Sequence, residues 1–118
     1  MGEVVYSDGH RVVTRVGAPT AGGAFACYAV RAAADPTARH PLGDVAFQFD
    51  TIPTVGVQGW TNKALLAVIL DRLRCFQASP YQCVENAEAI LHVVEAIAAL
   101  ERRTVDRRAR GVEGRHQP

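Results

Sequence analysis

Two helical patterns joined by a short turn constrain the fold of this chain more than any other feature. The first pattern covers Asn62–Gln77, and either Thr61 or Asn62 can cap its N-terminus. Its apolar residues recur at helical spacing and form one stripe, which consists of Leu65, Leu66, Ile69, Leu73 and Phe76.

The second pattern begins with a compact start signal. Ser79 can act as the N-cap, Pro80 suits the first helical position, and Gln82 can close a capping box. We therefore predict a second helix from residue 80 to about residue 110, where Gly111 ends it. A connection of about two or three residues makes the two helices antiparallel.

The second helix is long and has two apolar sides. About 30 residues of helix span roughly 45 Å, twice the length of the first helix, so the part from about Ala96 onward has no partner in its own hairpin. A second apolar side indicates that one face meets a second subunit, although a helix wedged between its partner helix and a sheet is an alternative for the first half. One side holds Val84, Ala87, Leu91, Val94 and Ala98, and the other holds Ile90, Val93, Ile97 and Leu100.

The first fifty residues have the pattern of a small antiparallel sheet. Residues 4–6 and 11–16 flank Asp8 and Gly9, a pair typical of a tight hairpin turn. Residues 25–30 and 45–49 are two further apolar strands.

We predict an α+β fold in a single domain, residues 1–118. Its parts are an N-terminal antiparallel β-sheet in residues 1–50, a linker in 51–60, a helical hairpin in 61–110 and a tail in 111–118.

Charge and cysteine content narrow the functional classes. A formal charge of +1 excludes a generic polyanion binder, but residues 101–118 hold six Arg against three acidic residues, which favours a small anionic ligand or a partner. Three cysteines without metal-ligand spacing, and a start without signal-peptide character, predict a soluble cytoplasmic protein in which Cys75 and Cys83 are buried structural thiols. No apolar run approaches the roughly 18 residues that span a bilayer, so we expect no membrane partner.

The arginine-rich end of the second helix is a candidate anion site. Arg103, Arg107 and Arg110 follow at i, i+4 and i+7, so a helix places them on one face, and each guanidinium suits phosphate or carboxylate. A solvated face of i,i+4 ion pairs is the alternative, because Glu101 and Asp106 lie in the same stretch.

Signals of catalysis are absent from the sequence. The four histidines have no partners at metal-ligand spacing, and there is no phosphate-binding glycine loop, nucleophile elbow or carboxylate pair. We therefore expect no enzyme, catalytic residue, metal site or cofactor.

Two residues near the hairpin turn suit a nucleotide. Phe76 offers an aromatic face, although a core position is its alternative role, and Asn86 offers an amide that both donates and accepts. Asn86 and Arg103 are seventeen residues apart on one helix, about 25 Å, which is too far for one mononucleotide-sized ligand. If both belong to one pocket, two chains build it with antiparallel long helices.

Three stretches of this chain together resemble the bacteriophage anti-Thoeris proteins, which share a helical-hairpin domain with phage anti-CBASS sponges. These are residues 56–68 (GVQGWTNKALLAV), the Phe76-Gln77, Pro80 and Glu85-Asn86-Ala87 elements, and the Arg-rich ending that closes in RGVEG at residues 110–114. The resemblance covers roughly residues 45–116, and the closing motif is its specific part.

The resemblance implies a sponge in the cytoplasm of the infected bacterium. Such proteins sequester the immune signal glycocyclic ADP-ribose without cleaving it, as homodimers that can assemble into hexamers, and some also take up cyclic oligonucleotides in separate pockets. The ligand roles of the family carry over to Phe76, Asn86, Arg103 and Arg107. An Arg-rich nucleic-acid-binding or regulatory module of phage origin is the alternative, and its binding would weaken steeply with salt. A nucleotide-cleaving enzyme ranks third.

Overall fold

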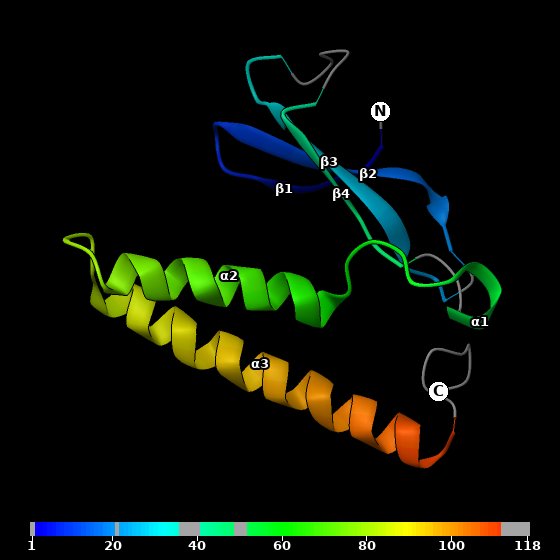
Figure 1. The fold of residues 1–118 in the computed structure, drawn as a ribbon. Helices are drawn as coiled ribbons and strands as arrows, with labels where there is room; N and C mark the ends of the chain where they lie inside the picture. The colour runs from blue at the N-terminus through cyan, green and yellow to red at the C-terminus, as the bar shows by residue number, and fades with distance from the viewer. Residues whose placement is uncertain (1, 21, 36–40, 49–51, 112–118) are drawn as a thin grey trace. The chain divides into compact units, whose positions relative to one another are not determined.

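The computed structural model describes residues 2–20, 22–35, 41–48 and 52–111 and confirms the predicted α+β class (Figure 1). The described residues form two compact units that divide between Trp60 and Thr61, where the predicted linker meets the predicted hairpin. Single-domain organisation stays a prediction.

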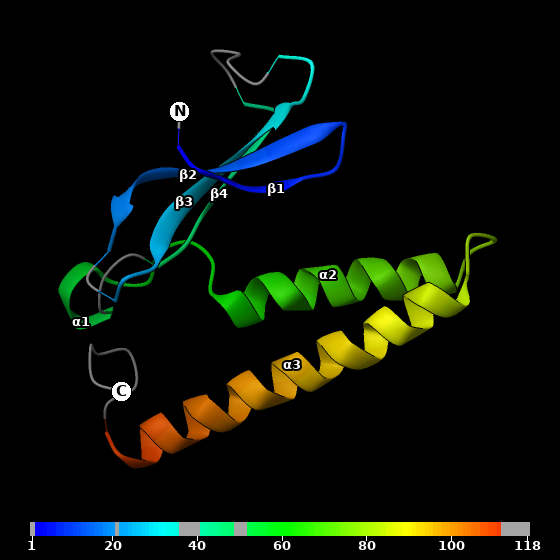
Figure 2. The same ribbon diagram turned by 180° about the vertical axis from the view of Figure 1, so that it is seen from behind.

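The first unit is a four-stranded antiparallel sheet in the order β1-β2-β3-β4 (Figure 2). Asp8 closes the first hairpin, because its Oδ1 accepts hydrogen bonds from the backbone N–H groups of His10 and Arg11 at 3.0 and 2.8 Å. The buried residues of the sheet are Thr14 and Ala29, which face each other in the central β2–β3 pair. The strands are β1 Val4–Ser7, β2 Arg11–Pro19, β3 Phe25–Ala32 and β4 Gly43–Ala46.

The fourth strand lies earlier than its prediction at residues 45–49. β4 ends at Ala46, and Phe47 makes an isolated parallel bridge with Trp60, while residue 49 lies outside the described residues. Gly59 allows this arrangement, since it has a φ of 57° and a Cβ there would lie 2.4 Å from the carbonyl oxygen of Ala46. A contact between segments this distant in sequence has no local signal.

The segment predicted as a linker contains the short helix α1, Ile52–Val55, and is held by one side chain of the sheet unit. Gln48 donates a hydrogen bond from Nε2 to the carbonyl of Gly56 at 2.9 Å, and its Oε1 accepts one from the backbone N–H of Gln58 at 2.8 Å. The chain therefore returns to the sheet unit before the hairpin begins.

The second unit is the predicted antiparallel hairpin of α2, Asn62–Gln77, and α3, Val84–Ala109, which lie side by side in both views (Figures 1 and 2). Of the two candidate caps, the structure selects Thr61, whose Oγ1 accepts a hydrogen bond from the backbone N–H of Ala64 at 3.1 Å. The bounds predicted for α2 are confirmed.

The prediction that the second helix begins at Pro80 with Ser79 as its cap was wrong. Ser79 instead lies at the C-terminal end of α2. Its hydroxyl donates a hydrogen bond to the carbonyl of Phe76 at 2.6 Å and accepts one from the N–H of Tyr81 at 3.1 Å. The connection consequently covers residues 78–83, and the Sγ of Cys83 caps α3 by accepting from the N–H of Asn86 at 3.4 Å.

One apolar side of α3 faces α2 and the other is open. Ile90, Val93, Ile97 and Leu100 are half-buried, whereas Val84, Ala87, Leu91, Val94 and Ala98 are exposed, Leu91 to 55%. In the part of the chain that the structure describes, Ala29 is the one buried apolar residue, so the hairpin buries no apolar side chain fully. The two-sided pattern is confirmed, and coverage of the open side by a second subunit stays a prediction.

Candidate anion and nucleotide site

The arginine-rich end of α3 presents its three candidate residues differently. Arg103 is exposed and makes no ion pair among the described residues. Arg107 is buried, with 4% of its surface exposed, and it interacts with other groups of the protein. Arg110 is the C-cap residue of α3, and its Nε lies 3.0 Å from the Oδ2 of Asp106.

The environments of these arginines support different alternatives, the anion site for Arg103 and the solvated face of i,i+4 ion pairs for Arg110. The pair of Arg110 and Asp106 at i,i+4 fits the solvated face, and such exposed pairs contribute little to stability. Arg103 keeps an exposed guanidinium for an anion, while a buried charge such as Arg107 needs partners within the protein.

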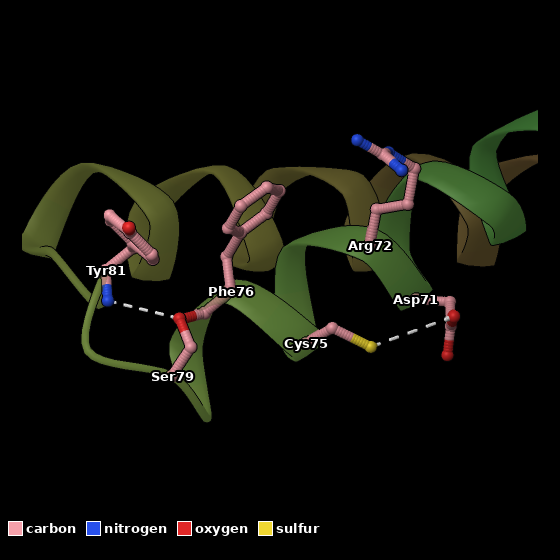
Figure 3. Close-up of a pocket in the computed structure, with 6 residues that line it drawn as sticks. All are labelled: Asp71, Arg72, Cys75, Phe76, Ser79 and Tyr81. Atoms are coloured by element: carbon pink, nitrogen blue, oxygen red, sulfur yellow. Dashed lines mark hydrogen bonds between the residues drawn. The ribbon is translucent and has the colours of Figure 1, made fainter.

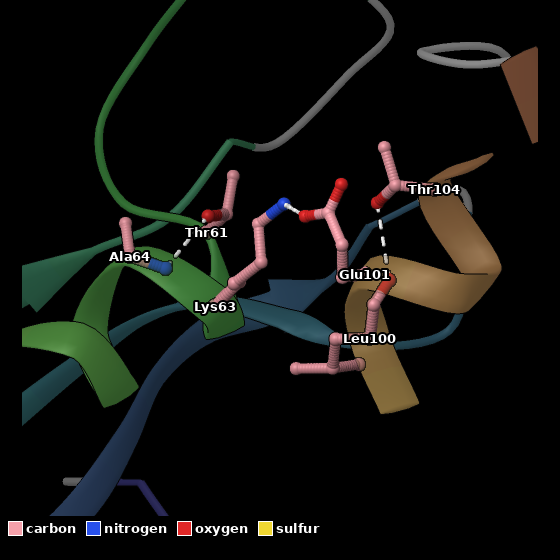
Figure 4. Close-up of polar contacts among 6 residues, drawn as sticks. All are labelled: Thr61, Lys63, Ala64, Leu100, Glu101 and Thr104. Atoms are coloured by element: carbon pink, nitrogen blue, oxygen red, sulfur yellow. Dashed lines mark hydrogen bonds and ion pairs between the residues drawn. The ribbon is translucent and has the colours of Figure 1, made fainter. Parts of the chain in front are cut away.

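An ion pair between the helices neutralises the acidic residue next to the cluster. Lys63, in the first turn of α2, donates a hydrogen bond to the carboxylate of Glu101 on α3 (Figure 4). The pKa of Glu101 is lowered, first by this hydrogen bond, then by the charge of Lys63 and by that of Arg108.

Lys63 also marks how far α2 reaches along α3. Because the first turn of α2 lies opposite Glu101, the overhang of α3 begins after residue 101. The prediction that it begins at about Ala96 was wrong. The shift follows from the later start of α3, since the connection of residues 78–83 adds length at the hairpin end.

The other end of the hairpin carries a hollow of about 400 Å³ (Figure 3). Phe76 lies in its wall with 44% of its surface exposed, so its ring is open to a ligand and does not close a core. The guanidinium carbon of Arg72 lies 5.9 Å from the centre of this ring. The lining residues are Asp71, Arg72, Cys75, Phe76, Ser79 and Tyr81.

Asn86 lies in the first turn of α3 and is half-buried. It is not among the residues that line the hollow of Phe76. Since α3 is one continuous helix from Val84 to Ala109, the seventeen residues between Asn86 and Arg103 separate them by about 25 Å. The described chain therefore does not bring these two residues together.

Arg72 and Tyr81 line this hollow but are not among the predicted site residues. Arg72 precedes Phe76 by four residues, so the i,i+4 spacing in α2 is a signal that was available. The predicted second helix includes Tyr81, but the residue lies in the connection of residues 78–83, and this position places it in the hollow.

The prediction that Cys75 and Cys83 are buried was wrong, since both are exposed. Cys83 is held at the surface because its sulfur caps α3, and the sulfur of Cys75 lies 4.0 Å from the Oδ2 of Asp71. No described helix is long and apolar enough to cross a membrane, and no group of three or more His, Cys, Asp or Glu in the described ranges could hold a metal ion.

The hairpin, its arginine-rich end and its exposed aromatic agree with the predicted resemblance to phage anti-Thoeris proteins, and a sequence comparison confirms that resemblance. The chain is 42% identical, over 76 residues or 64% of its length, to Thoeris anti-defense 1 of Bacillus phage SBSphiJ7. The match covers 54% of that protein, so the chain spans about half the length of this curated relative. No protein-family model matches the chain.

The pair of Lys63 and Glu101 predicts how acid affects the hairpin. Because the folded-state pKa of Glu101 lies below its ordinary value of 4.5, the contribution of the pair is complete above about pH 4.5 and is lost as the pH falls through the lowered pKa. Denaturant midpoints measured from pH 7 to pH 3 should therefore fall less steeply for Glu101→Gln than for the parent protein.

Glu95→Gln is the matched control, since Glu95 is an exposed acid on the same helix whose described ion-pair partner is His92. The control should keep the acid dependence of the parent. Equal slopes for Glu101→Gln and the parent protein would show that the pair contributes nothing.

Proposed function

We propose that this chain is a phage anti-defence protein that binds and sequesters glycocyclic ADP-ribose without cleaving it, and so blocks Thoeris immunity. The observation that carries the proposal is the 42% identity to a protein named Thoeris anti-defense 1. Two features of the hairpin support a nucleotide ligand, namely the exposed ring of Phe76 and the exposed guanidinium of Arg103.

Arg103 is the pyrophosphate contact in this proposal. Its guanidinium can donate charge-assisted hydrogen bonds to phosphate, and it has no carboxylate partner in the described ranges that would compete with them. Arg107 and Arg110 follow within two turns, and their positive charges add to the local potential.

Phe76 and Asn86 are the base contacts. A ring with an open face stacks on adenine, and the side-chain amide of Asn86 can pair with an adenine edge. Both lie at the hairpin end of the unit, which is the end away from Arg103.

Two chains must build this pocket, because Asn86 and Arg103 of one chain lie about 25 Å apart on the same helix. The charges of α3 favour an antiparallel second copy. Its first half carries three Glu and no Lys or Arg, whereas its second half carries four Arg against Glu101 and Asp106, so antiparallel α3 helices bring a net negative half beside a net positive one. The open apolar side of α3 is available for this contact.

Sequestration differs from cleavage in what the protein releases. The protein is incubated with glycocyclic ADP-ribose and retained on an ultrafiltration membrane, and the retained fraction is then heated and analysed by mass spectrometry. We expect a filtrate depleted of the signal and intact signal after heating. A full filtrate would contradict binding, and linear ADP-ribose in the heated fraction would indicate an enzyme.

Arg103→Ala should weaken binding of glycocyclic ADP-ribose by about ten- to a hundredfold, because a hydrogen bond to a charged group contributes about 1.5–3 kcal/mol. Calorimetric titration measures the change. Arg74→Ala is the matched control, since it removes the same charge from an exposed position in α2 that has no part in the proposed pocket. Equal affinity of Arg103→Ala and the parent protein would remove Arg103 from the site.

A further inference from the structure

The hollow at the hairpin end contains more ligand chemistry than Phe76 alone. Two aromatic rings line it, and Tyr81 is the more open of them, with 76% of its surface exposed. The rings of Phe76 and Tyr81 project to the same side of the hairpin end (Figure 3), and the only close aromatic ring pair among the described residues is Tyr28 with Phe47. Because both side chains are exposed, part of each ring surface is available to a flat ligand.

Ser79 sets the two aromatic positions relative to each other. Its hydroxyl donates to the carbonyl of Phe76 at 2.6 Å and accepts from the N–H of Tyr81 at 3.1 Å, so one side chain ties both backbones together. A stacking site whose backbone is already held loses less entropy when a ligand binds.

Arg72 adds a cation on the same side. Its guanidinium carbon lies 5.9 Å from the centre of the Phe76 ring, and it makes no ion pair among the described residues. Asp71, the acidic residue of the hollow, projects away from the ring, and its Oδ2 lies 4.0 Å from the sulfur of Cys75 (Figure 3). Among the six lining residues, Arg72 is thus the charged group beside the open ring.

We propose that Arg72, Phe76 and Tyr81 form a nucleoside-monophosphate half-site within one chain. The base stacks on Phe76 and Tyr81, and Arg72 binds the phosphate attached to the same nucleoside. This inference rests on the proposed function. The two phosphates of the ligand are then bound by different chains: Arg72 binds the phosphate on the adenosine side, and Arg103 of a second copy binds the other.

The half-site can be tested without the cyclic ligand, because it requires only a base and a phosphate. AMP and adenosine are titrated against the protein by saturation-transfer NMR. We expect AMP to bind more tightly than adenosine. Tyr81→Leu should weaken binding of both probes by about 5- to 100-fold, and Arg72→Gln should reduce AMP affinity to that of adenosine while leaving adenosine binding unchanged.

Matched controls test whether the loss of AMP binding is specific to the half-site or follows from losing any exposed arginine or tyrosine. Arg74→Gln removes the same charge from an exposed position in α2 outside the hollow, and Tyr6→Leu removes an exposed tyrosine from β1. Both controls should keep the AMP affinity of the parent protein. All four variants should keep its thermal midpoint, since each replaces an exposed side chain.

The outcomes distinguish this inference from the proposed function. If the parent protein binds glycocyclic ADP-ribose but binds no AMP, or binds AMP equally well after Tyr81→Leu and Arg72→Gln, the half-site is wrong and the proposed function stands. If AMP binds as expected while glycocyclic ADP-ribose does not bind, the half-site stands and the proposed function is wrong.

Discussion

The seam between α2 and α3 is the contact on which the rest of the hairpin unit depends, and it is incomplete in one chain. α2 has 16 residues and α3 has 26, so the shorter helix reaches only as far as Glu101, where Lys63 pairs with it. It covers one apolar side of α3 and leaves the side of Leu91 and Val94 open. This open apolar stripe supports the second copy that we propose, because a small chain gains most of its stability from apolar burial.

The same geometry separates the two kinds of ligand contact that we propose. The exposed rings lie at the hairpin turn, while Arg103 lies in the part of α3 that α2 does not cover. The continuous helix α3 keeps Asn86, at the hairpin end, about 25 Å from Arg103. The open stripe and the overhang would therefore be the features that assemble the proposed pocket between two chains.

Local patterns predicted much of this fold. Asp8 and Gly9 predicted the first hairpin, and the apolar periodicity with Thr61 predicted α2 at its observed bounds. The predicted start of α3 was wrong because Ser79 can make two kinds of local hydrogen bond, one that caps the N-terminus of a following helix and one that caps the C-terminus of the preceding helix. The sequence pattern is the same for both.

Long-range contacts account for most of what the sequence did not predict. The end of β4 depends on the close approach of Gly59 to Ala46, and the burial of Arg107 distinguishes it from Arg103 although both satisfy the same helical spacing. Arg72 could have been found from its spacing to Phe76, whereas the place of Tyr81 follows from how the connection folds.

Complementation between two inactive variants tests the two-chain pocket most directly. Asn86→Ala and Arg103→Ala chains are mixed under conditions that exchange subunits, and binding of glycocyclic ADP-ribose is measured by calorimetry before and after mixing. In a mixed dimer one pocket collects both substitutions and the other collects none, so binding should return at up to one site per mixed dimer. If each pocket lies within a single chain, every pocket carries one substitution, and mixing would restore no binding.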